Sequence, residues 1–177
     1  MTKRIWSVLI LGGILAFSIA AQDISPSARN PTTDGILGAD EYSFNGTYSN
    51  MKLGVSLSAD GKTLYLALEA PTTGWVALGL GARAMNGAFI VFGSVAKGKP
   101  IVSEQTGKGH GHRPNKENQL AASAVRETSG TTVLEIALPA ATYATGNTMP
   151  ILMSYSASDS FMLKHSVYAS AELSIAK

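Results

Sequence analysis

The sequence predicts an all-β protein, an immunoglobulin-like β-sandwich of about 9 to 11 strands. Short runs in which apolar residues alternate with polar or small ones recur roughly every 8 to 14 residues, with turn signals between them. After the first twenty residues no segment keeps an apolar period of 3.6, so long amphipathic helices are not expected. No internal repeat is evident. Regularly spaced short strands of this kind are typical of a sandwich.

The first twenty residues resemble a secretory signal peptide and are not expected to join the core. A basic start, "MTKR", precedes a run of 16 uncharged, mostly apolar residues that ends in Ser18-Ile19-Ala20. Small residues at 18 and 20 suit cleavage after Ala20. An uncleaved anchor is the alternative, but the run is short for a membrane span of about 20 residues. We therefore expect a periplasmic or secreted protein with no membrane span after cleavage.

Charge and cysteine content narrow the possible functions. Removing Lys3 and Arg4 with the signal lowers Lys plus Arg from 14 to 12, which equals the 12 Asp plus Glu. A near-neutral mature chain does not suggest nucleic-acid binding. The absence of cysteine excludes disulfides, a lipoprotein anchor, thiolate ligands and covalently attached c-type haem.

The chain after the signal divides into a leader and one domain. Residues 21–33 are polar and contain two prolines, so we expect an extended leader. Residues 34–177 form the β-sandwich domain, which opens with a turn and a short element at 34–43. Residues 52–58 and 63–70 then alternate about Asp60-Gly61, the signature of a β-hairpin.

The rest of the domain consists of further strand candidates and one polar loop. The strand candidates are residues 74–81, 88–95, 100–104, 120–127, 131–138, 151–157 and 164–175. Residues 105–118 between them are rich in Gly, Lys, His and Asn, and we expect an exposed loop without essential chemistry.

Two residues raise the question of a ligand. Met85 stands in a turn of small residues directly before an apolar strand, where it either fills a gap or presents its sulfur to a metal. In the last strand candidate, alternation places His165 on the same, inward face as Val167 and Leu173. An inward histidine is either hydrogen-bonded within the core or binds a ligand, and the pattern alone favours the core.

The remaining chemistry is sparse. His110 and His112 have a spacing that can hold a metal, but no third ligand is near in sequence, which favours a solvated loop. The chain has no nucleophile elbow, phosphate-binding glycine loop or zinc-protease motif. We therefore expect a binding or carrier protein and not an enzyme.

Three segments resemble the DOMON domain family. "GWVALGLGARAMNGAFIVFG" is similar to the family's strand, glycine-rich turn, Met and second strand. "SYSASDSFMLKHSVYASAEL" is similar to its late signature, an Asp in a turn followed by a His at the final strand, and "DGILGADEY" resembles the start of single-domain bacterial members. The resemblance covers about residues 34 to 175.

This resemblance implies a β-sandwich and, for its haem-binding members such as the cytochrome domain of cellobiose dehydrogenase, a b-type haem held between Met and His. The corresponding residues here are Met85 and His165, with Lys164 and Met162 as possible substitutes for a ligand. The expected function is electron transfer to a redox partner protein that the sequence does not name. The apolar side chains available to enclose haem are Trp75, Phe89, Val91, Phe92, Met153, Met162 and Tyr168.

Two other functions stay open at this stage. One is a haem-free module that binds carbohydrate through an aromatic platform, and the other is an envelope domain with a protein partner. The candidate platform residues are Tyr42, Phe44, Tyr48 and Trp75.

The signal peptide can be tested directly. N-terminal sequencing of protein recovered from the cell envelope or medium should begin at Ala21, because cleavage follows Ala20. Intact Met1 in a membrane fraction would contradict this prediction.

Overall fold

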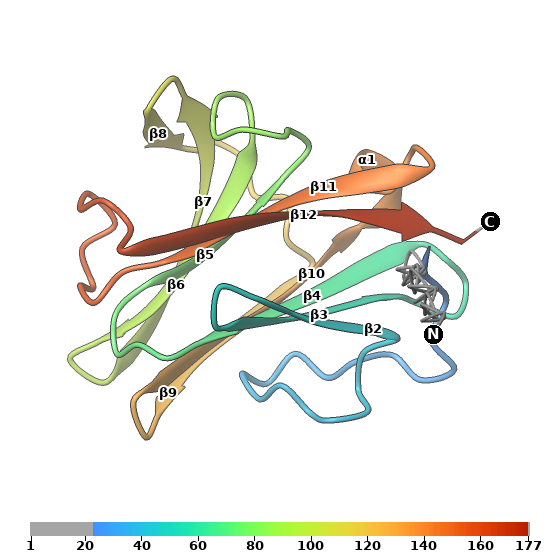
Figure 1. Cartoon of the computed structure of the whole chain (residues 1–177), viewed down its shortest axis with the longest axis horizontal. Helices are drawn as coiled ribbons and strands as arrows, with labels where there is room; N and C mark the ends of the chain where they lie inside the picture. Colours follow the sequence, from blue (N-terminus) through green and yellow to red (C-terminus); the bar gives the residue numbers. More distant parts are fainter. Residues whose placement is uncertain (1–22, 177) are drawn as a thin grey trace, which may run out of the picture.

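A computed structural model describes residues 23–176, so the expected signal peptide and its cleavage site lie outside the described residues. Two β-sheets face each other across one core, with a single short helix at their edge (Figure 1). The predicted all-β sandwich is confirmed. The described part of the chain contains no helix long and apolar enough to cross a membrane.

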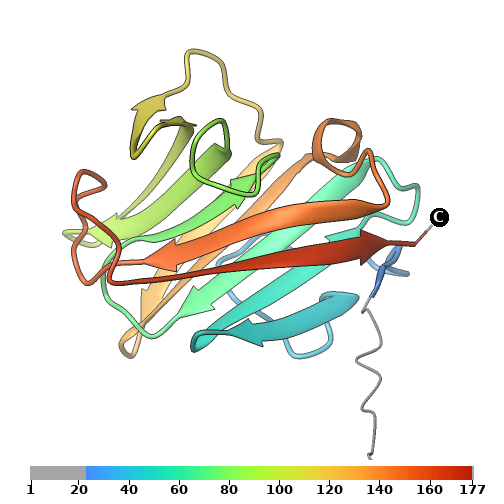
Figure 2. The same ribbon diagram turned by 45° about the horizontal axis from the view of Figure 1, so that its top comes forward.

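The first sheet has seven strands in the order β1-β12-β11-β5-β6-β7-β8. Their bounds are Asp23–Ile24 for β1, Val167–Ile175 for β12, Thr148–Tyr155 for β11, Val76–Leu80 for β5, Phe89–Ala96 for β6, Lys99–Lys108 for β7 and Gly111–Pro114 for β8. All neighbouring pairs are antiparallel except β1 and β12. Figure 2 shows β11 (orange) and β12 (red), two adjacent strands of this sheet, side by side at the front of the view.

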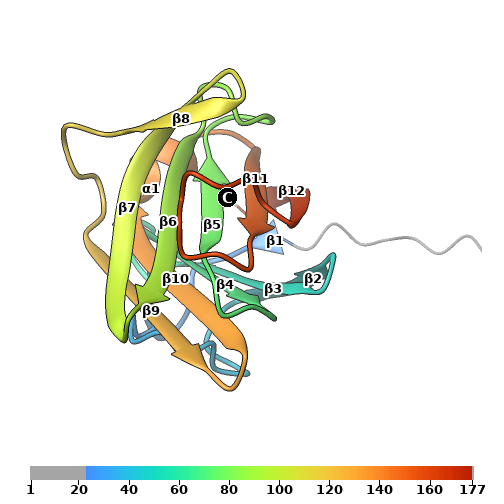
Figure 3. The same cartoon turned by 90° about the vertical axis from the view of Figure 1, so that its left-hand side faces the viewer.

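The second sheet has five antiparallel strands in the order β2-β3-β4-β10-β9. Their bounds are Phe44–Tyr48 for β2, Met51–Leu57 for β3, Thr63–Ala70 for β4, Thr131–Pro139 for β10 and Ala122–Thr128 for β9. The helix α1, Ala140–Tyr143, follows β10. Figure 3 shows this sheet beneath β5, β6 and β7.

Side-chain alternation builds the core between the two sheets. Leu66 and Leu134 from one sheet meet Leu78, Val91 and Ile151 from the other, and all five are buried. Each of these strands therefore turns every second residue toward the opposite sheet, as the period of a strand requires.

The predicted hairpin about Asp60-Gly61 is present as β3 and β4. The strand β2 was not predicted, because its sequence "FNGTY" contains Asn45-Gly46, which is typical of a turn. The chain instead turns at Ser49 and Asn50, which both have positive φ. Gly46 lies within the strand. A Cβ atom at this position would come within 2.9 Å of the rings of Phe44 and Tyr48, which favours glycine here.

A buried glutamate fixes the segment before β2 onto the outer face of the second sheet. Glu135, in the middle of β10, is fully buried. Its carboxylate accepts hydrogen bonds from the backbone N–H groups of Asp34 (2.8 Å) and Gly35 (2.6 Å) and from the hydroxyl of Tyr42 (2.7 Å). A buried carboxylate needs such donors, since an unpaired one is costly.

Burial raises the pKa of Glu135 above its ordinary value, although the three donors oppose this effect. Burial and the bond to Glu135 also raise the pKa of Tyr42, so its hydroxyl keeps its proton. Because the folded pKa of Glu135 is raised, its protonation favours the folded state. This contribution to stability is present below the unfolded pKa, near 4.5, and is lost as pH rises through the folded pKa.

We expect Tyr42→Phe to lower the free energy of unfolding by roughly 1–3 kcal/mol at neutral pH, because it removes a donor to a buried carboxylate. The loss should shrink toward pH 4, where Glu135 is protonated and needs fewer donors. Urea denaturation at both pH values measures this. Tyr65→Phe is the control, since the Tyr65 hydroxyl makes no hydrogen bond within residues 23–176. An equal loss of unfolding free energy in the two variants would contradict a stabilising role for the hydrogen bond from Tyr42 to Glu135.

Candidate functional site

The outer face of the seven-stranded sheet is also apolar. Trp75, Ala77, Ala88, Ile90 and Phe92 form a second buried cluster, separate from the core between the sheets. Ala77 on β5 and Ile90 and Phe92 on β6 alternate with residues of the core between the sheets. Their side chains therefore point away from the second sheet. An apolar sheet face that no second sheet covers must be covered by loops or by a ligand.

A pocket of about 700 Å³ lies on this face. Ala77 and Gly79 of β5 give it a low floor, because their side chains are small or absent. Phe92 of β6 and Leu152 of β11 border that floor. The volume is within the range of sites that enclose compact organic ligands or cofactors.

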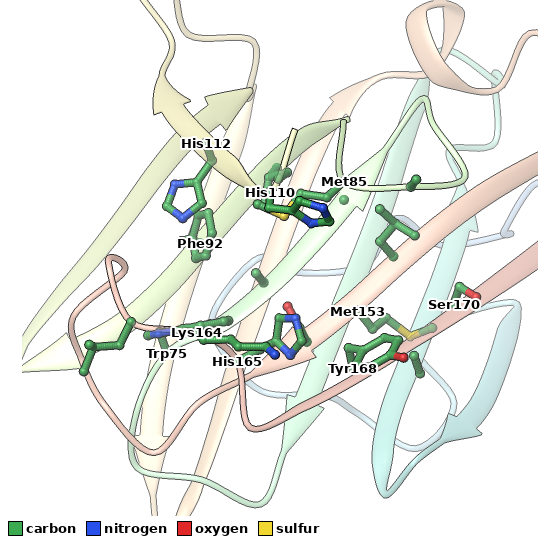
Figure 4. A pocket seen from close by; sticks show the side chains of 18 of the residues that line it. Trp75, Met85, Phe92, His110, His112, Met153, Lys164, His165, Tyr168 and Ser170 are labelled. Atoms are coloured by element: carbon green, nitrogen blue, oxygen red, sulfur yellow. The ribbon is translucent and has the colours of Figure 1, made fainter. Parts of the chain in front are cut away.

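The two ends of β5 define two opposite rims. The register pairs Val76 with Tyr155 at one end and Leu80 with Phe89 at the other. The β11–β12 loop therefore rises at the first end and the β5–β6 turn at the second, about 13 Å apart along the strand. Both loops line the pocket, and Figure 4 shows side chains from each facing the space between them.

Met85 lies on the rim formed by the β5–β6 turn. The backbone N–H of Ala88 donates to the carbonyl of Met85 (3.1 Å), which closes the turn, and Gly87 takes a positive φ of 84°. The turn also pairs with β7: the N–H of Gly87 donates to the Gly107 carbonyl, and the N–H of Gly107 donates to the Ala88 carbonyl, both at 2.9 Å.

Close backbone contact fixes the position of Met85. A Cβ atom on Gly107 would lie 1.7 Å from the carbonyl oxygen of Met85, so only glycine allows this approach. On the other side of the turn, the guanidinium of Arg83 forms a two-pronged ion pair with the carboxylate of Glu172 on β12. The turn is thus held by contacts with β7 on one side and β12 on the other.

His165 lies on the opposite rim, in the β11–β12 loop. The base of this loop is fixed where the N–H of Trp75 donates to the Ser158 carbonyl (3.0 Å) and the N–H of Ser156 donates to the Trp75 carbonyl (2.9 Å). The ring of His165 is half-buried and packs on Tyr168, with ring centroids 5.1 Å apart. Burial, and then the charge of Lys164, lower its pKa, which favours the neutral imidazole that binds metals.

The position of His165 differs from the one predicted from strand alternation. The final strand begins at Val167 and not at residue 164, so strand alternation does not extend to His165. The residue faces a pocket on the outside of the sheet, whereas the sequence pattern predicted the inward face. Met85 and His165 nevertheless line one pocket.

The polar loop predicted at residues 105–118 is partly a hairpin. Residues 105–108 extend β7, and Gly111–Pro114 form β8. His112 packs on Phe92, with ring centroids 4.8 Å apart, and its Nδ1 lies within hydrogen-bonding distance of the Gln105 side chain. His110 and His112 both line the pocket, although the segment was expected to be an exposed loop without essential chemistry. The segment "KGHG" is a turn signal between polar strand residues and could have revealed the hairpin.

The predicted apolar wall residues divide into two groups. Trp75 and Phe92 belong to the outer cluster and line the pocket. Met153 packs in the core between the sheets and also reaches the pocket. Phe89 and Val91 face that core instead, because they have the opposite parity on β6.

Two features of this pocket are typical of ligand-binding sites. The indole Nε1 of Trp75 is buried and has no hydrogen-bond partner within the described residues. Met162, Leu163 and Tyr168 line the pocket and are 86%, 57% and 71% exposed, which is unusual for large apolar side chains gathered on one rim. No group of three or more His, Cys, Asp or Glu residues within residues 23–176 could hold a bare metal ion.

Solved structures with a similar fold are known. The structure is similar to the cytochrome b domain of pyranose dehydrogenase from Coprinopsis cinerea, with a TM-score of 0.56 and 14% identity over 73% of this chain and 80% of that one. It is also similar to the cytochrome domain of cellobiose dehydrogenase from Myriococcum thermophilum, with a TM-score of 0.55 and 10% identity over 75% of this chain and 81% of that one. No curated protein matches the chain by sequence.

The model of the DOMON domain family matches residues 47–154, which is more than half of the chain. The matched segment runs from β2 to β11, so it includes the Met85 turn and most of the pocket floor. The protein therefore belongs to the DOMON domain family.

Proposed function

We propose that this protein is an exported b-type haem-binding DOMON domain that transfers electrons, with Met85 and His165 as the iron ligands. One observation carries the proposal: a thioether and an imidazole line opposite rims of a single pocket with an apolar floor. The two structurally similar domains are named as cytochromes, which supports the same cofactor.

The residues of the pocket fit a haem. Ala77 and Gly79 leave room for a flat group above the sheet, and Phe92 and Leu152 would pack against its apolar parts. The exposed Met162 and its neighbours on the rim would lose their contact with water. The unpaired Nε1–H of Trp75 is a donor of the kind that a carboxylate of the ligand accepts.

Bound haem would supply a one-electron redox centre. The contribution of Met85 is a soft thioether, which favours ferrous iron and so raises the reduction potential. His165 contributes a neutral imidazole, since burial and Lys164 lower its pKa. If Met85 and His165 both held the iron, the protein would leave no open position for oxygen or substrate, which would suit electron transfer to a partner protein.

The chain's other residues would bind and shield the group. Contact with the apolar floor would remove apolar surface of the haem from water, and each Å² buried would favour binding by about 25 cal/mol. Trp75 and Phe92, whose rings meet edge to face at 5.2 Å, would exclude water from one side. With no cysteine in the chain, this packing and the two ligands would have to retain the haem alone.

The structure does not favour a carbohydrate-binding module. Tyr42, Phe44 and Trp75 are 5%, 3% and 2% exposed, so three of the four aromatic residues considered for a sugar platform cannot stack on a sugar ring.

The ligand assignment predicts different effects for the two residues. His165→Ala should weaken haem binding by more than the roughly 10- to 100-fold that loss of a supporting residue costs, because it removes a ligand itself. Met85→Ala should keep haem but lower its reduction potential. Hemin titration measures haem binding and redox potentiometry measures the potential. Lys164→Ala is the control, because it tests whether Lys164 binds the iron in place of His165. Unchanged low-spin spectra in both ligand variants would contradict the assignment.

Gly107→Ala should displace Met85, because the new Cβ would overlap the Met85 carbonyl. We expect the reduction potential to fall toward that of Met85→Ala while the fold is retained. Gly111→Ala is the matched control in the same hairpin, since its Cβ would meet only the Lys108 carbonyl at 3.7 Å and its φ is not positive. Redox potentiometry compares the two variants. Equal potentials would show that Gly107 does not position the ligand.

A further inference from the structure

The pocket contains a second imidazole on the same rim as Met85. We propose that His110 is an alternative iron ligand for the coordination position of Met85, so that the protein can exchange thioether for imidazole. This inference rests on the proposed haem site and adds a residue that the family resemblance does not assign.

His110 lies next to the Met85 turn. It lies in the turn between β7 and β8, where the backbone N–H of Gly109 donates to the side-chain oxygen of Asn86 (2.8 Å). Asn86 directly follows Met85, so the two turns are joined. Figure 4 shows His110 beside Met85, with His165 across the pocket, and all three line it. His110 and Met85 therefore approach the same side of a group bound between the rims.

The ring of His110 is less constrained than that of His112. His112, two residues away, is held by Phe92 and by the Gln105 side chain. The His110 side chain is exposed and makes no hydrogen bond or ring contact within residues 23–176. Such a side chain can change rotamer at little cost and reach a vacant coordination position. His112 would first have to break its contacts.

The chemistry of the donor atoms also suits ligand exchange. The histidines do not group closely enough with other ligand side chains to bind a bare ion within the described residues. They can act together only through a larger group that spans the pocket. A thioether favours ferrous iron, whereas imidazole also binds ferric iron well. Exchange would break the Fe–S bond and form an Fe–N bond from a neutral ring, without transfer of an electron or a proton.

The test uses the full-length mature protein reconstituted with hemin, first as the wild type and as Met85→Ala. If His110 is a ligand, ferric Met85→Ala should stay six-coordinate and low-spin, with two nitrogen axial ligands in its EPR spectrum. Adding His110→Ala should give five-coordinate, high-spin haem that transfers to apomyoglobin about tenfold faster or more. Adding Lys108→Ala to Met85→Ala instead should leave the spectrum unchanged, because Lys108 is an exposed residue of the same hairpin that does not line the pocket.

Two results would overturn this inference alone: high-spin haem already in Met85→Ala, or low-spin haem that persists in Met85→Ala/His110→Ala. A wild-type protein that takes up no haem would overturn the proposed function as well. The wild-type titration therefore separates failure of the haem site from failure of the His110 assignment.

Discussion

The site depends on one constraint: the seven-stranded sheet is apolar on both faces, but the second sheet covers only one of them. The inner face is sealed by the facing sheet. The outer face, floored by Ala77 and Gly79, is enclosed only by loops and leaves a pocket of about 700 Å³. An ordinary sandwich has polar residues on its outer faces. Here the proposed ligand would bury both the apolar outer residues and the exposed apolar rim.

Backbone hydrogen bonds and one ion pair connect the two rims of the pocket to the strands of the sheet. Gly107 lets β7 approach the Met85 turn, and the ion pair of Arg83 with Glu172 ties the same turn to β12. On the other rim, Trp75 joins the base of the β11–β12 loop to β5 through two backbone hydrogen bonds. A ligand that needs donors from both rims would meet them nearly in place, which lowers the cost of ordering on binding.

Local patterns predicted the strands well and the site only in part. The hairpin of β3 and β4 follows from alternation about Asp60-Gly61, since both signals lie within a few residues. Residues that depend on distant partners could not be read in this way. The burial of Glu135 depends on donors about 100 residues away. The need for glycine at 107 depends on the carbonyl of Met85, and the place of His110 depends on a hairpin with a polar sequence. The pairing of Met85 with His165 as candidate ligands was inferred from the family resemblance, whereas strand alternation placed His165 on the inward face and the structure places it at the pocket on the outer face.

A crystal structure of the mature protein reconstituted with haem tests the central claim most directly. Our account predicts one haem above Ala77 and Gly79 on the outer face of the seven-stranded sheet, with Met85 and His165 as axial ligands and Trp75 Nε1 hydrogen-bonded to the ligand. Haem bound elsewhere on the protein, or bound in this pocket through other axial residues on both sides, would contradict it.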